Sequence, residues 1–202
     1  RFAVKTGEAC WLERWTQAAK TTGIRALKGL RTSVQKAIQA FGQAFLREPD
    51  NHLLREALRS GALTPHEYFQ QLLRLVYRLI FVMVAESRML PDPDGSNRTY
   101  SLIEDPKAPD RHRERYRKYY TFQRFSELAG RPTSGPRHAD LYEQVKLVMG
   151  LLGGRGDASA LGLSVLNGFL FAETTTPHLD RARLANGPFL EGIRALSTTT
   201  ED

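Results

Sequence analysis

Residues 64–90 read TPHEYFQQLLRLVYRLIFVMVAESRML, and this stretch decides the fold of the chain. Thr64 suits the residue that caps a helix start, and Pro65 suits the first helical position. Glu67 follows Thr64 by three residues, where a capping box places its carboxylate. From Tyr68 onward, apolar residues recur at every third or fourth position. The stretch therefore predicts a long helix at the centre of the structure.

The second half of this helix, residues 79–85, is apolar on every side. A helix of that kind is normally buried all round, so we expect the core to enclose this part. A membrane span needs about 20 consecutive apolar residues. The run here is much shorter and lies between Arg78 and Glu86, so we expect a core helix without membrane contact.

Charged residues in the same helix predict an ion pair. Arg74 and Arg78 lie one turn apart, and Glu86 follows Arg78 by two turns on roughly the same face. A structural ion pair between Arg78 and Glu86, buried or half-buried, would anchor the helix in the core. The simpler interpretation is that these charges form the solvated edge of a core helix.

Composition limits the classes of function. Of the 202 residues, 41% are hydrophobic, which is enough for one domain with a substantial core. The formal net charge of +7 and the isoelectric point near 9.7 favour nucleic acid or another polyanion as partner. A single cysteine, Cys10, excludes a disulfide framework, and no secretory signal opens the chain, so we expect a cytoplasmic protein.

Helical patterns fill most of the chain, so we predict an all-α, multi-helix domain spanning residues 1–202 around the central helix. Its parts are N-terminal helices and the central helix (1–90), a loop (91–110) and a second helical part (111–202). Further helices are expected at residues 10–19, 24–45, 52–60, 140–152 and 188–196. We expect the chain to be a fragment of a longer polypeptide at both ends.

Glycines and threonines set the expected ends of these elements. Thr22 and Gly23 should break the first N-terminal helix from the second, and Gly61 should stop the helix at residues 52–60. Residues 160–171 are apolar but interrupted by Gly162 and Gly168, which predicts a short extended segment.

Residues 110–128 read DRHRERYRKYYTFQRFSEL, in which basic and aromatic residues alternate. Cations suit the phosphates of nucleic acid, and aromatic rings suit stacking. A second basic surface without acids lies in residues 24–45. The candidate DNA-backbone residues are Arg111, Arg113, Arg115, Arg117, Lys118, Arg25, Lys28 and Arg31. The alternative, which stays open, is that the helices formed by these two segments pack their apolar faces inward and expose their cations to solvent.

A weaker pattern suggests a Mg²⁺-dependent nuclease. Asp92 follows a proline, and Asp105 and Lys107 follow later with Pro106 between them. In such sites two carboxylates hold the metal and the lysine polarises the phosphate or the attacking water. That geometry usually requires adjacent strands, for which Pro106 is poorly suited, so the nuclease is a minor alternative. The five histidines have no metal-ligand spacing, and we assign no catalytic, cofactor-binding or metal-binding residue in this chain.

Four segments carry a resemblance. They are GIRALKGLRTSVQKAIQAFGQAFL (23–46), LLRLVYRLIFVMVAESRML (72–90), ALGLSVLNGFLF (160–171) and LDRARLANGPFLEGIRALS (179–197). In this order they resemble the N-terminal helical region of large adenine-N6 DNA methyltransferases. These are the single-chain type IIG restriction–modification enzymes and the related methylases of the BREX and DISARM phage-defence systems.

The resemblance implies a parent enzyme that transfers a methyl group from S-adenosylmethionine to adenine N6. Its implied partners are double-stranded DNA, the methyltransferase domain of the same parent chain and other subunits of a defence system. That family uses a glycine-bearing cofactor loop and an Asn-Pro-Pro-Tyr/Phe loop for the flipped adenine. This chain has neither, because Asn186-Gly187-Pro188-Phe189 lacks the first proline. The resemblance therefore implies a supporting segment, with DNA contact or, alternatively, with protein docking alone.

Overall fold

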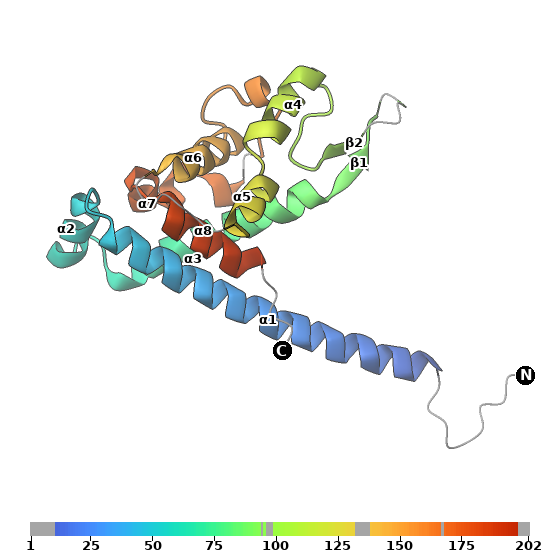
Figure 1. Cartoon of the computed structure of the whole chain (residues 1–202), viewed down its shortest axis with the longest axis horizontal. Coiled ribbons are helices and arrows are strands. Elements are labelled where there is room, and N and C mark those ends of the chain that lie inside the picture. The colour runs from blue at the N-terminus through green and yellow to red at the C-terminus, as the bar shows by residue number, and fades with distance from the viewer. Residues whose placement is uncertain (1–10, 94, 96–98, 132–137, 167, 198–202) are drawn as a thin grey trace, which may run out of the picture.

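A computed structural model describes residues 11–93, 95, 99–131, 138–166 and 168–197, which are mostly helical (Figure 1). The α-helices are α1 (Trp11–Arg47), α2 (His52–Ser60), α3 (Pro65–Ser87), α4 (Asp110–Tyr119), α5 (Phe122–Ala129), α6 (Asp140–Leu152), α7 (Pro177–Arg181) and α8 (Asn186–Ser197). The 3-10 turns η1 (Ala158–Leu161), η2 (Phe169–Phe171) and η3 (Glu173–Thr175) lie between α6 and α7. In the described residues, strands are limited to the antiparallel pair β1 (Met89–Pro91) and β2 (Thr99–Ser101). The predicted all-α fold is confirmed.

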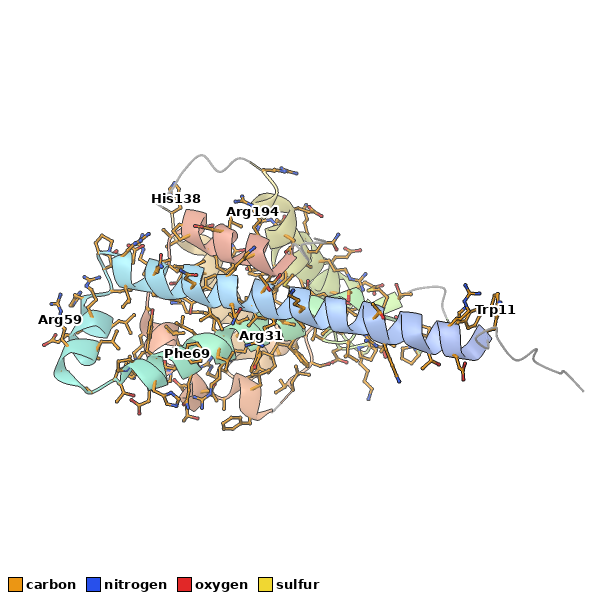
Figure 2. All side chains as sticks on the ribbon, turned by 90° about the horizontal axis from the view of Figure 1, so that it is seen from below. Trp11, Arg31, Arg59, Phe69, His138 and Arg194 are labelled. Carbon is orange, nitrogen blue, oxygen red and sulfur yellow. The ribbon has the colours of Figure 1, made fainter. Side chains whose placement is uncertain are left out.

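Helix α1 runs without interruption, so the predicted break at Thr22 and Gly23 is wrong. A glycine inside a helix costs only about 1 kcal/mol relative to alanine, too little to stop a helix of otherwise favourable composition. The C-terminal part of α1 packs on α8 and α3, along a face whose buried residues include Ser33, Ala37, Phe41 and Phe45. Figure 1 shows the N-terminal part extending beyond the body of the molecule, and Figure 2 shows Trp11 at its far end.

Helix α3 begins as predicted. The backbone N–H of Thr64 donates to the Glu67 carboxylate at 2.8 Å, and the Glu67 N–H donates to Thr64 Oγ1 at 3.2 Å, which completes the capping box. The helix ends earlier than expected, because Met89 pairs with Ser101 in the β1–β2 hairpin. Helix α2 also ends as predicted, at Gly61, whose φ of 78° lies in the left-handed region that favours glycine.

The outer face of α3 differs from the prediction. The inner face is buried, through Leu72, Leu75, Val76, Leu79 and Val82. Tyr77, Phe81 and Val84 on the other side are 49%, 38% and 48% exposed, so the expectation that residues 79–85 are enclosed on every side is wrong. The elements packed on α3 cover one side of it only. By length and composition α3 is the one described helix that could cross a membrane, but half of its most apolar window is buried, as in a core helix.

The region of residues 110–128 forms two helices instead of one. Thr121 separates α4 from α5, and its hydroxyl accepts a hydrogen bond from the Arg124 N–H at 3.4 Å, as an N-cap residue does. In the predicted extended segment, Gly162 ends η1 with a φ of 63°. Leu163 then forms a single antiparallel bridge with Glu104, and η2 follows. Extended structure in the described part of this segment is therefore brief.

One hydrophobic cluster runs through both halves of the chain. Phe189 on α8 lies against Phe41 on α1 and against Phe125 on α5, with ring centroids 6.2 and 5.5 Å away. Gly192 allows this packing, because a Cβ at that position would lie 2.2 Å from the Phe41 ring. The first and last described helices therefore share one core, as expected for a single domain.

Candidate functional site

Arg78 lies in the core, with 1% of its surface exposed. Its guanidinium donates to the carbonyls of Leu170 and Ala172 at 2.7 and 2.9 Å. It also donates to the hydroxyls of Thr175 and Thr176, and the Asp180 carboxylate lies 3.6 Å away. Burial lowers the pKa of Arg78, and Asp180 opposes that shift. Arg78 thus fixes the η2–η3–α7 region onto α3.

The predicted ion pair between Arg78 and Glu86 is therefore wrong. Positions 78 and 86 are separated by eight residues, or about 12 Å along the helix axis. This is too far for direct contact between the two side chains. The Glu86 carboxylate instead accepts a hydrogen bond from the Tyr116 hydroxyl at 2.5 Å. It also accepts from the backbone N–H groups of Phe122 and Gln123, at 2.9 and 3.2 Å. Glu86 therefore binds the N-terminus of α5, where a negative charge is favourable.

Burial raises the pKa of Glu86 above its usual value, although the three donors act in the opposite direction. Burial and the neighbouring Glu86 carboxylate raise the pKa of Tyr116 as well. Tyr116 is thus a neutral phenol, and its hydroxyl donates a hydrogen bond to the Glu86 carboxylate.

A second buried carboxylate, Glu104, lies close by. Arg117 donates to it twice, from Nε at 2.7 Å and from Nη2 at 2.8 Å, in the bidentate arrangement that arginine favours. The Ser101 N–H donates to the same carboxylate at 2.6 Å. This hydrogen bonding raises the pKa of Arg117. The ion pair fixes α4 to the turn that follows β2.

An open cavity of about 550 Å³ lies between these groups. Most of its lining residues are polar or charged, and they are Glu86, Met89, Ser101, Glu104, Tyr116, Arg117, Lys118, Thr121, Gln123, Arg124, Glu127, Leu128 and Arg131. The Ser101 hydroxyl is buried and has no hydrogen-bond partner among the described residues. Glu86 and Glu104 both accept hydrogen bonds from protein donors, and through them they join neighbouring elements of the fold.

The nuclease pattern does not form a site in the described residues. The Asp92 carboxylate is buried and accepts from Arg113 at 3.3 Å. The Asp105 carboxylate accepts from the Lys107 N–H at 2.9 Å, as in a local turn. Within the described ranges, no group of three histidine, cysteine, aspartate or glutamate residues is placed to hold a metal ion. The structure thus gives this alternative no support.

On α4, two of the predicted DNA-backbone arginines are paired with buried carboxylates, and one of the two is itself buried. Arg113 is 5% exposed and binds both Asp92 and Asp110, so its assignment to a DNA contact is wrong. Arg117 is held by Glu104, as described above. The buried residues of α4 are Arg113 and Tyr116, and Arg117 lies next to this side with its guanidinium on the buried Glu104 carboxylate. Arg111, Arg115 and Lys118 are exposed, and Arg115 also donates to the Ala160 carbonyl at 3.1 Å.

The other part of the predicted set lies on α1. Lys28 and Arg31 are exposed, while the side chain of Arg25 lies outside the described residues. Figure 1 places α1 and α4 on opposite sides of the body, so the predicted set does not form one surface. The partners of Arg78 and the burial of Glu104 could not be predicted from the sequence, because neither depends on a local pattern. No family model, curated protein or solved structure matches this chain, so the family suggested by the sequence resemblance stays a prediction.

Proposed function

We propose that this chain is a helical, DNA-backbone-contacting and structural segment of a bacterial adenine-N6 DNA methyltransferase in restriction–modification or phage defence. The resemblance of four ordered segments supplies the family, and α1 supplies the DNA-contacting surface. In this proposal the parent enzyme works in the cytoplasm. Its methyltransferase domain, which holds S-adenosylmethionine and the catalytic loop, lies outside the residues described here.

The absence of acids from residues 14–47 of α1 is the observation that carries the proposal. Residues 14–47 contain lysines and arginines but no aspartate or glutamate. Lys28, Arg31 and Lys36 are exposed, and α1 extends beyond the body, where a duplex can reach it (Figure 1). At 1.5 Å per residue, residues 14–47 span about 50 Å, which exceeds one turn of B-DNA. Such a surface suits phosphates and carries no means of reading bases.

Helix α4 is the weaker candidate for DNA contact. Asp110 and Glu114 lie among its cations, and Arg113 and Arg117 are bound to carboxylates. We therefore place the DNA-backbone contact on α1 and assign α4 mainly to the structural role.

A pair of charge-matched variants tests this placement. Lys28→Glu with Lys36→Glu reverses two exposed cations of α1, and Arg111→Glu with Arg115→Glu makes the same change in net charge on α4. Binding of a short labelled duplex is measured by fluorescence anisotropy over a range of salt concentrations. We expect the α1 variant to bind about tenfold more weakly or worse. The slope of log K against log salt should decrease by about two, because each lost phosphate contact removes about 0.9.

The α4 variant is expected to stay close to the wild type. Equal weakening by both variants would mean that net charge alone governs binding, which contradicts the placement on α1. A wild-type protein that retains no DNA even at low salt would contradict the DNA contact itself. That result would favour the second candidate, a protein-docking helical scaffold of a defence complex, for which the exposed apolar side of α3 is the supporting observation.

A further inference from the structure

An apolar stripe follows the outside of α3. Phe69, Tyr77, Phe81 and Val84 are exposed, and Leu73 and Ile80 between them are partly exposed. Their spacing of three, four or seven residues places them on one side of the helix. We call this set of six residues the α3 outer face. Single exposed apolar residues are ordinary, but a contiguous stripe of this kind marks an interaction site.

The charges beside the α3 outer face indicate the kind of partner that binds there. Helix α1 runs next to α3, since the Tyr68 hydroxyl donates to the Gly42 carbonyl at 2.8 Å. Figure 2, which views the molecule from below, labels Arg31 on α1 and Phe69 on α3. The neighbouring helix thus brings exposed cations and, over residues 14–47, no acid. On α3 itself, Arg88 is exposed at the end of the stripe. A surface that is apolar in the middle and cationic along its edge suits an acidic amphipathic partner.

We propose that the α3 outer face docks an acidic amphipathic helix of a partner protein. The apolar side of that helix lies on Tyr77, Phe81 and Val84, and its flanking carboxylates face Arg31 and Lys28 of α1. A second copy of this chain fits poorly, because it would bring residues 14–47 of its own α1, which contain no acid, against those of the first. The inference deepens the structural half of the proposed function and rests on it.

Two synthetic helical peptides test the docking. Both carry leucines at i, i+3, i+4 and i+7, and they differ only in glutamates or lysines at the flanking positions. Binding of each labelled peptide to the full chain is measured by fluorescence anisotropy. We expect the glutamate peptide to bind at least tenfold more tightly than the lysine peptide. Added salt should reduce that preference.

Variants locate the site. Tyr77→Glu with Val84→Glu should weaken binding of the glutamate peptide at least tenfold, because it places acids on the stripe. Arg31→Glu should weaken it several-fold. Leu147→Glu, at a residue of α6 that is similarly exposed, is the matched control and should leave binding unchanged. Circular dichroism checks that each variant keeps its helical content.

Equal binding of both peptides, or loss of binding in the Leu147→Glu control, overturns the inference. So does self-association in sedimentation that Tyr77→Glu with Val84→Glu abolishes, since the occupant is then a second copy. Co-sedimentation with anionic lipid vesicles that depends on the same residues overturns it in favour of a membrane surface.

The double α3 variant should still bind DNA. A protein that binds DNA but no peptide therefore contradicts the docking alone, and one that binds the peptide but no DNA contradicts the DNA contact alone.

Discussion

Arg78 illustrates how far a buried charge depends on distant partners. Its partners belong to residues 170–180, about a hundred positions further along the chain. The sequence shows an arginine next to an apolar run and a glutamate two turns later, and from these a local ion pair is the natural prediction. Helix geometry keeps Arg78 and Glu86 apart, however, and each is satisfied by a different part of the fold. No local pattern could have identified Asp180 as the counter-charge.

Replacing Arg78 should strongly destabilise the fold. In Arg78→Met the carbonyls of Leu170 and Ala172 each lose a hydrogen bond and the Asp180 carboxylate loses an ion-pair partner, while the apolar stem is kept. Removing one partner of a buried ion pair typically costs about 3–5 kcal/mol, so we expect a loss of that order in the free energy of unfolding measured with urea. Arg88→Met, at an exposed arginine of the same segment, is the control and should change stability by less than about 0.5 kcal/mol. Similar losses in the two variants would contradict this role of Arg78.

Between elements, Glu86 connects the end of α3 to the start of α5. Because burial raises its pKa above the usual 4.5, the folded state keeps a proton on this carboxyl to a higher pH than the unfolded state does. The stability that this proton contributes is complete below pH 4.5 and is lost as the pH rises through the folded pKa. Stability should therefore decrease with rising pH in that window.

Glu86→Gln removes this titration, because the amide has no proton to lose. We expect the unfolding free energy of the wild type, minus that of the variant, to fall as the pH is raised from 4.5 towards neutrality. Urea titrations of both proteins at a series of pH values measure this difference. A difference that grows with pH would mean that the α5 N-terminus stabilises the carboxylate more than burial disfavours it.

Local sequence predicted the elements whose ends are set by local chemistry. The capping box of α3 and the left-handed Gly61 after α2 each depend on residues within one turn, so their positions could be read directly. The length of α1 could not, because Thr22 and Gly23 weaken a helix without stopping it. The exposure of the α3 outer face is likewise a property of what packs around the helix. An apolar sequence predicts burial but does not name the element that covers it.

At the scale of the molecule, α1 belongs to the fold along only part of its length. Its C-terminal part packs on α8 and α3, where Ala37, Phe41 and Phe45 are fully buried. Its N-terminal part extends away from the body, and Trp11 and Trp15 there are exposed and contact each other, with ring centroids 4.8 Å apart. The candidate DNA surface could be read from the sequence as a run of cations without acids. Its separation from α4 could not, because that depends on the packing of the whole chain.

This division of α1 predicts a step in hydrogen-exchange protection. A helical segment without tertiary contacts is only marginally stable in water, whereas one packed into a core opens mainly with the whole domain. Amides of residues 15–30 should therefore exchange much faster than those of residues 35–47, as measured by hydrogen-exchange mass spectrometry. Bound DNA should slow exchange by a larger factor in the first range than in the second, because the core already protects the second range, even though Lys36 lies there. Equal protection of both ranges in the free protein would show that another contact already holds the N-terminal part of α1, and would remove the reason to expect a partner there.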